Sequence, residues 1–204
     1  LLWFVLVLSA VLMSSGCGSD DDNSSGGGNS NSGYLTSKDI VINDTLTVSG
    51  PNTHAIEVSG DGSVMSYSHL RINKTGDGSG EESDFYGTNA AVLASNGAAL
   101  TLTDSLVITD GAYANGVFSY GSGTTVNVKD SVIITTSNNS GGIMTTGGGT
   151  MNAEHLTIET SGGSSAAIRS DRGGGTVSVD RGSYTSSGRG SPAIYSTADI
   201  SVKN

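Results

Sequence analysis

Hydrophobic and polar residues alternate along this chain in short runs, and Gly, Ser, Asn and Asp separate the runs. A period of two is typical of a β-strand with one buried face, and the separating residues are those that form turns. A small residue followed by a β-branched one returns at spacings, by subtraction, of 25, 26, 25 and 26 residues, at Ala91-Val92, Gly116-Val117, Gly142-Ile143, Ala167-Ile168 and Ala193-Ile194. This constant period predicts a repeat protein in which one short unit is stacked many times.

Each repeat of 24 to 26 residues contains three alternating runs with turns between them. Three short strands per coil is the unit of a parallel β-helix, an all-β solenoid in which each strand pairs with its counterpart one coil later. A β-sandwich would not require a constant period, and no segment has the length and composition that a helical solenoid needs. We expect the β-helix to occupy residues 34–204, after a signal peptide and a disordered linker.

The composition fits a thin aliphatic core, because aromatic residues make up 5% of the chain and there are 31 glycines. The balance of 9 Lys and Arg against 19 Asp and Glu gives a net charge of −10. No basic cluster that would neutralise phosphates is present, which excludes nucleic acid as a partner.

The N-terminus carries targeting signals. Residues 1–13 form an apolar run, broken only by Ser9, that is too short to cross a bilayer and has the length of a signal-peptide core. The run ends in Ser14-Ser15-Gly16-Cys17, which resembles a bacterial lipobox. The resemblance implies that 1–16 is a lipoprotein signal peptide whose first residues are missing from the sequence. It also implies that Cys17, the one cysteine, is lipidated and anchors the protein in a membrane.

A tract of Gly, Ser, Asn and Asp follows the cysteine, and we expect residues 17–33 to form a flexible, lipid-anchored linker. The run Ser19-Asp20-Asp21-Asp22 resembles the signal that exports lipoproteins to the bacterial cell surface. An outer-membrane lipoprotein on the cell surface is therefore expected, or one on the extracytoplasmic face of the cell membrane. An acidic, solvated linker is the alternative reading of these aspartates.

The tail of the chain, at Ala166–Val177 and Ser191–Ile200, resembles a recurrent unit of bacterial adhesin-like surface proteins. Their fold is a right-handed, pectate-lyase-like parallel β-helix, and the resemblance covers about residues 90–204. It implies a cell-surface protein with an adhesin or carbohydrate-binding role. It supplies no catalytic residue.

The first strand of each coil offers a candidate binding surface. If the β-branched residue of each pair points inward, the residue after it points outward. These outward positions, with Tyr120 in the following turn, form what we call the stripe: Leu93, Phe118, Tyr120, Met144, Arg169 and Tyr195. Apolar side chains that face solvent in this way would suit an extracellular glycan or a host or cell-surface protein. The alternative is that a loop or a missing part of the chain covers them.

Two groups of acidic residues are candidate calcium sites, because Ca²⁺ binds carboxylate oxygens. One lies in 74–89, a passage about ten residues longer than its counterparts and expected to protrude from a corner of the solenoid: Asp77, Glu81, Glu82 and Asp84. The other is expected to stack in the turn before the third strand: Asp104, Asp130 and Glu154. The alternatives are a solvated loop and aspartates that bond turn amides. No other cofactor is expected.

The sequence shows no catalytic constellation. The polygalacturonase-type signatures Asn-Thr-Asp, Gly-His-Gly and Arg-Ile-Lys are absent, and the three histidines are spread along the chain. We therefore expect a non-enzymatic protein. Residue 204 falls inside a coil, so we expect the natural protein to continue beyond it. Two alternatives stay open: the N-terminal part of a polysaccharide lyase or hydrolase with active coils beyond this residue, and a purely structural surface stalk.

Overall fold

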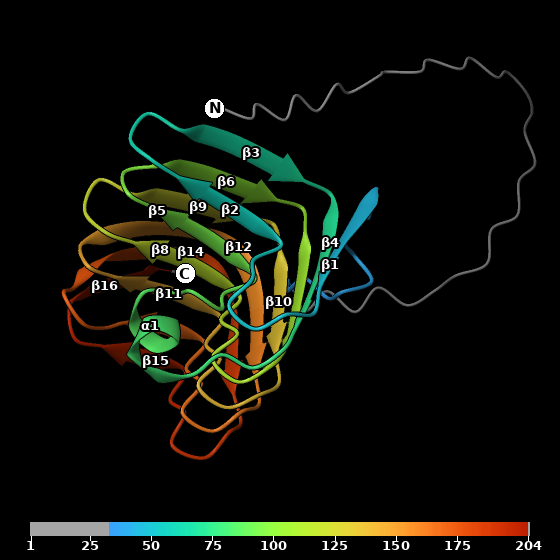
Figure 1. Cartoon of the computed structure of the whole chain (residues 1–204). Coiled ribbons are helices and arrows are strands. Elements are labelled where there is room, and N and C mark those ends of the chain that lie inside the picture. Colours follow the sequence, from blue (N-terminus) through green and yellow to red (C-terminus); the bar gives the residue numbers. More distant parts are fainter. Residues whose placement is uncertain (1–32, 204) are drawn as a thin grey trace, which may run out of the picture. The chain divides into compact units, whose positions relative to one another are not determined.

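Parallel strands stacked coil upon coil build the chain over residues 33–203, which the computed structural model describes (Figure 1). The architecture is a right-handed parallel β-helix of about six turns, as the repeat predicts. One strand of each coil joins a six-stranded sheet, in the order β15 (Ile194–Ser196), β13 (Ile168–Ser170), β11 (Ile143–Thr146), β8 (Val117–Tyr120), β5 (Val92–Ser95) and β2 (Ile56–Ser59).

The other two strands of each coil form a ten-stranded sheet with two limbs. The first limb contains β1 (Asp44–Val48), β4 (Leu70–Thr75), β7 (Leu106–Asp110) and β10 (Val132–Thr135). The second contains β3 (Val64–Ser68), β6 (Ala99–Thr103), β9 (Thr125–Lys129) and β16 (Asp199–Lys203). The limbs meet in two long strands that turn a corner, β12 (Gly149–Thr160) and β14 (Gly175–Ser186).

The prediction of three strands per coil is confirmed, but in two coils the second and third strands are continuous. The corner in β12 takes a single residue in the left-handed region, His155 at φ 51°, and the corner in β14 takes two residues at positive φ, Arg181 at 57° and Gly182 at 128°. Such a corner redirects the chain without a loop, so strand pairing continues on both sides of it.

The core is a column of aliphatic side chains inside the coils. Val92, Val117, Ile143 and Ile168, the β-branched members of four pairs, are completely buried. The residue before them is Gly or Ala, and in the second and third of these pairs it must be Gly, since a Cβ on Gly142 would collide with Ile158 and with the carbonyl oxygen of Ala167. The period read from the sequence thus reflects the close approach of backbone and side chain at one inner corner.

The passage between β4 and β5 does not protrude, and that expectation was wrong. It contains the helix α1 (Gly80–Phe85), which lies against the outer face of the six-stranded sheet (Figure 1). A helix of six residues is not stable alone in water, so its tertiary contacts must hold it. Glu81 and Glu82 in its first turn complement the helix dipole.

The predicted signal peptide (1–16), the lipidation residue Cys17 and the linker as far as residue 32 lie outside the described residues. Among residues 33–203, no helix has the length and apolarity to cross a membrane.

Candidate functional site

The stripe has the register that the repeat predicts. Phe118 pairs with Leu93 and with Met144, and the same register continues through Arg169 to Tyr195. The expected exposure of its apolar members was wrong, however. Phe118 and Met144 are completely buried and Leu93 is 5% exposed, whereas Tyr195 is 43% exposed.

The helix α1 and the turn after it cover the apolar part of the stripe. Phe85 and Tyr120 pack against a second hydrophobic cluster, separate from the core and formed by Ala90, Leu93, Phe118 and Met144. Thr146 Oγ1 donates a hydrogen bond of 2.5 Å to the Phe85 carbonyl oxygen. The turn passes so close to the sheet that a Cβ on Gly87 would lie 2.7 Å from the Phe118 ring. The covering segment is the insertion at 74–89 that the repeat spacing identified, but the sequence did not indicate which surface it would cover.

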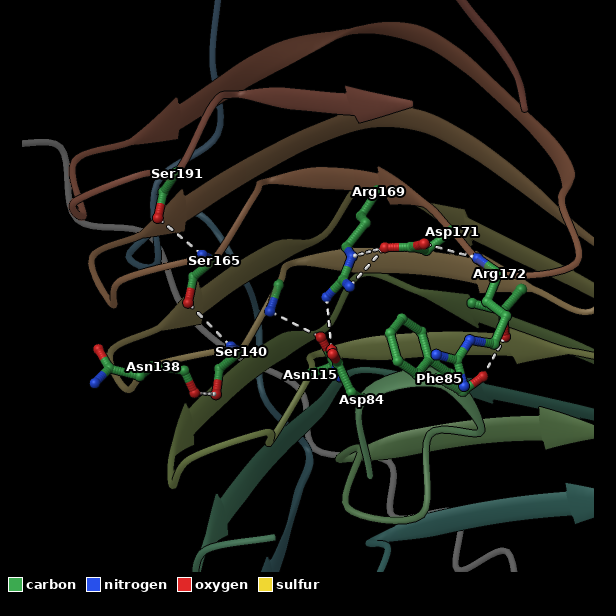
Figure 2. A network of polar contacts seen from close by, with 12 residues as sticks. Asp84, Phe85, Asn115, Asn138, Ser140, Ser165, Arg169, Asp171, Arg172 and Ser191 are labelled. Carbon is green, nitrogen blue, oxygen red and sulfur yellow. Dashed lines mark hydrogen bonds and ion pairs between the residues drawn. The ribbon is translucent and has the colours of Figure 1, made fainter. Parts of the chain in front are cut away.

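Arg169 is the polar centre of the interface between α1 and the sheet (Figure 2). Its Nη1 donates to Asp84 Oδ1 at 2.8 Å, while its Nε and Nη2 donate to Asp171 Oδ2 at 3.1 and 2.7 Å. The guanidinium carbon lies 5.6 Å from the centre of the Phe85 ring and 5.8 Å from that of Tyr195, within cation–π range. Burial disfavours the charge, but the bonds to Asp84 and Asp171 outweigh burial and raise the pKa of Arg169 above its ordinary value.

A second arginine, Arg172, binds the first turn of α1. Arg172 donates from Nη1 and Nη2 to the two carboxylate oxygens of Glu81, at 2.7 and 3.1 Å. Its guanidinium also lies 3.9 Å from the centre of the Phe85 ring. Figure 2 shows the two side chains beside each other. The hydrogen bond from Arg172 lowers the pKa of the Glu81 carboxyl. The compact charged cluster at residues 169–172 is therefore the docking surface for the helix.

A pocket of about 300 Å³ opens between α1, the end of β13 and one corner of the solenoid. We call it the α1 pocket; it is lined by Asp84, Asn139, Ser164, Ala166, Arg169, Asp171, Gly190, Pro192 and Tyr195. Two members of the stripe, Arg169 and Tyr195, thus come together at a concave site. Tyr120 does not line it and instead packs on Tyr86, with ring centres 5.2 Å apart.

A ladder of serines holds the corner that forms one wall of the α1 pocket (Figure 2). The Ser191 hydroxyl accepts from the Ser165 amide at 2.8 Å, and the Ser165 hydroxyl accepts from the Ser140 amide at 2.9 Å. Asn139 and Ser164, which line the pocket, directly precede two of these serines. The wall is therefore preorganised by hydrogen bonds between successive coils.

Several polar groups of the α1 pocket keep unused hydrogen-bonding capacity. A guanidinium has five N–H donors, and Arg169 forms three hydrogen bonds. Asp84 uses Oδ1, but its Oδ2 has no hydrogen-bond donor among the described residues. Within residues 33–203, the side chains of Asn139, Ser164 and Tyr195 also form no hydrogen bond. The site combines donors, acceptors and one aromatic ring.

The acidic residues of 74–89 do not converge as the calcium hypothesis requires. Glu81 and Asp84 bind the two arginines, and Asp77 Oδ1 instead accepts a hydrogen bond of 2.8 Å from the Ala112 amide. In the part of the chain that the structure describes, no three His, Cys, Asp or Glu side chains lie close enough together to hold a metal ion.

The second acidic group is not a stack of carboxylates, and the expected alignment was wrong by one residue. Asp104 and Asp130 both occupy the left-handed corner, at φ 47°, but the next residue in that position is His155. Glu154 instead pairs in register with Lys129, and its carboxylate lies 3.3 Å from the Lys129 ammonium. Asp130 accepts from His155 Nδ1 at 2.8 Å. The Lys129 ammonium lies within 4.0 Å of Asp130 as well as near Glu154, so this cation reduces the repulsion between these two carboxylates.

The residues that sequence reasoning missed as pocket members come from corners and turns rather than from the stripe. Asn139, Ser164 and Gly190 recur at the period of the repeat, immediately before or near the serines of the ladder. That recurrence is a signal for a shared corner, but it carries no information about the helix that closes the pocket.

Comparison with known proteins adds no assignment: no family model matches the chain, and no curated protein or solved structure is significantly similar to it.

Proposed function

We propose that this protein is a non-enzymatic, adhesin-like surface protein that binds a carbohydrate in the α1 pocket. The observation that carries the proposal is the composition of this pocket. It is a preorganised depression with a buried arginine, two carboxylates and a half-exposed tyrosine ring on an otherwise regular rod. Small-molecule sites are concave and have a few convergent polar groups beside an apolar surface.

Sugar hydroxyls donate and accept hydrogen bonds, so a sugar site needs both kinds of partner. The open N–H groups of Arg169 are donors and Asp84 Oδ2 is an acceptor, while Asn139 supplies both. The C–H face of a pyranose ring is apolar and suits an aromatic surface such as Tyr195, which is 43% exposed at the rim. The ordering cost of binding is reduced, because hydrogen bonds between successive coils already hold the corner that forms one wall of the pocket.

Replacing Tyr195 with Ala tests the site. On an array of bacterial and host glycans, we expect the wild-type domain, residues 33–204, to bind a subset, and Tyr195→Ala to weaken that binding about tenfold through loss of the ring. Tyr34→Ala is the matched control, because Tyr34 is similarly exposed at 49% but lies outside the pocket. Unchanged binding by Tyr195→Ala, or cleavage of the bound glycans, would contradict the proposal.

Display at the cell surface is a separate part of the proposal, supported by the Ser14-Ser15-Gly16-Cys17 motif and the acidic run after it. In a bacterium that expresses the natural precursor, we expect Cys17→Ala to abolish labelling by a metabolic fatty-acid probe. Ser24→Ala, in the linker, is the control and should leave labelling intact. Persistent labelling of Cys17→Ala would refute the anchor.

A further inference from the structure

The charged side chains of the α1 pocket favour some classes of sugar over others. We propose that the pocket binds an uncharged pyranose through two neighbouring hydroxyl groups and excludes uronic acids. This inference rests on the carbohydrate-binding function proposed above and names the ligand class of the same site.

The charged side chains that line the pocket carry a net negative charge. Asp84 and Asp171 carry two negative charges against the one positive charge of Arg169. The nearby pair of Arg172 and Glu81 adds nothing to this balance. The whole chain carries a net charge of −10, so the field at the site also disfavours anions.

Arg169 is already bound by two carboxylates of the protein itself. A sugar carboxylate would seek the guanidinium, but Asp84 and Asp171 occupy it from two sides, at 2.8 and 2.7 Å. The side chain of Arg169 is 12% exposed, and the carboxylates beside it are 20% and 16% exposed. Displacing either one would leave a partly buried carboxylate without its cation, which is strongly unfavourable.

Arg169 and Asp84 can still offer a hydrogen-bond donor and an acceptor to a ligand. The Arg169 Nη1 and the Asp84 carboxylate form one ion pair and each retains capacity, because Nη1 carries a second N–H and Asp84 Oδ2 has no hydrogen-bond donor among the described residues. Two adjacent hydroxyls match this arrangement, because one donates to the carboxylate while the other accepts from the guanidinium. A hydrogen bond to a charged group is about twice as strong as a neutral one, so this pair of contacts would dominate recognition.

The size of the pocket limits the ligand. About 300 Å³ is at the lower end of small-molecule sites, and it suits a single sugar residue rather than a long groove. Tyr195 and Pro192 line the pocket and offer apolar surface on which the face of the ring would rest.

The experiment compares sugars that differ only at C6. Calorimetric titration of the 33–204 domain would use three pairs of methyl pyranosides: galactose against galacturonate, glucose against glucuronate, and mannose against mannuronate. In every pair that binds, we expect the neutral member to bind at least tenfold tighter. Asp84→Asn should weaken the neutral sugar about tenfold and reduce the discrimination against the uronate. Glu159→Gln, which removes one negative charge from an exposed position on β12, should change neither value.

The outcomes separate the two proposals. If a uronate binds as tightly as its neutral partner, or tighter, this inference is overturned while the carbohydrate-binding function stands. If the wild-type domain binds no member of the three pairs and no glycan on the array, the proposed function itself fails. Asp84→Asn could also displace α1, and hydrogen exchange over residues 80–92 would reveal such a displacement. In that case the preference of the wild-type domain for the neutral sugar or the uronate still decides whether the inference holds.

Discussion

Phe118→Ala is expected to lower the free energy of unfolding by about 3–5 kcal/mol and to release α1 from the sheet. Phe118 is completely buried, and its ring lies between β8 and the turn at Gly87. Truncation removes the centre of the cluster that Leu93, Met144 and Phe85 share. The helix is too short to persist without that contact.

Chemical denaturation measures the loss of stability, and hydrogen exchange measures the release of residues 80–92. Two methionines supply a matched control, because Met144 is completely buried in the same cluster whereas Met65 is 46% exposed on β3. We expect about 2–5 kcal/mol for Met144→Ala and much less for Met65→Ala. Equal effects at the two methionines would mean that α1 does not seal the cluster.

The repeated part of the chain could be predicted from its sequence, whereas the fold of the insertion could not. The spacing of the small and β-branched pairs predicted the coil, the register and the inward wall, because stacking repeats one geometry in every turn. The insertion at 74–89 obeys no repeat, so its extra length led us to expect a protruding loop, and the pattern carried no information about the surface on which it folds back. Its docking depends on contacts with β8, β11 and β13, which lie far along the chain.

The misaligned acidic turn has a different cause. Alternation fixes which strand residues point inward, but the corner residue interrupts the paired register, so the pattern does not distinguish its position from that of the residue before it. The structure resolves it through the backbone, since Asp104, Asp130 and His155 share the left-handed conformation while Glu154 is paired within β12. Asp is enriched among the non-glycine residues that adopt that conformation, which accounts for its recurrence at this corner.

The same docking event that buries the apolar stripe also makes the candidate site. Asp84 is delivered by α1, whereas Arg169 and Asp171 come from the end of β13 and the turn after it. Without the helix, Leu93, Phe118 and Met144 would face solvent and Arg169 would lose one of its two carboxylates. The proposed sugar binding and the stability of the fold therefore depend on the same contacts, and Arg169 takes part in both.

Arg169→Leu is expected to lower the free energy of unfolding by about 2–4 kcal/mol. Removing the cation leaves Asp84 and Asp171 partly buried and without their partner, at 20% and 16% exposure. Breaking a fully buried pair costs about 3–5 kcal/mol, and the residual exposure of these carboxylates reduces that value somewhat. The same substitution should abolish sugar binding, because it removes the donors of the α1 pocket.

Arg172→Leu is the matched control for this effect. Arg172 also binds a carboxylate of α1, but its side chain is 45% exposed and that of Glu81 is 69% exposed, so solvent screens the pair. We expect a clearly smaller loss from Arg172→Leu in the same denaturation experiment. Adding Asp84→Ala to Arg169→Leu should recover part of the loss, since the variant no longer carries that unpaired carboxylate. If both arginines contribute equally, or if the double substitution is additive, Arg169 does not hold α1 through the contacts described above.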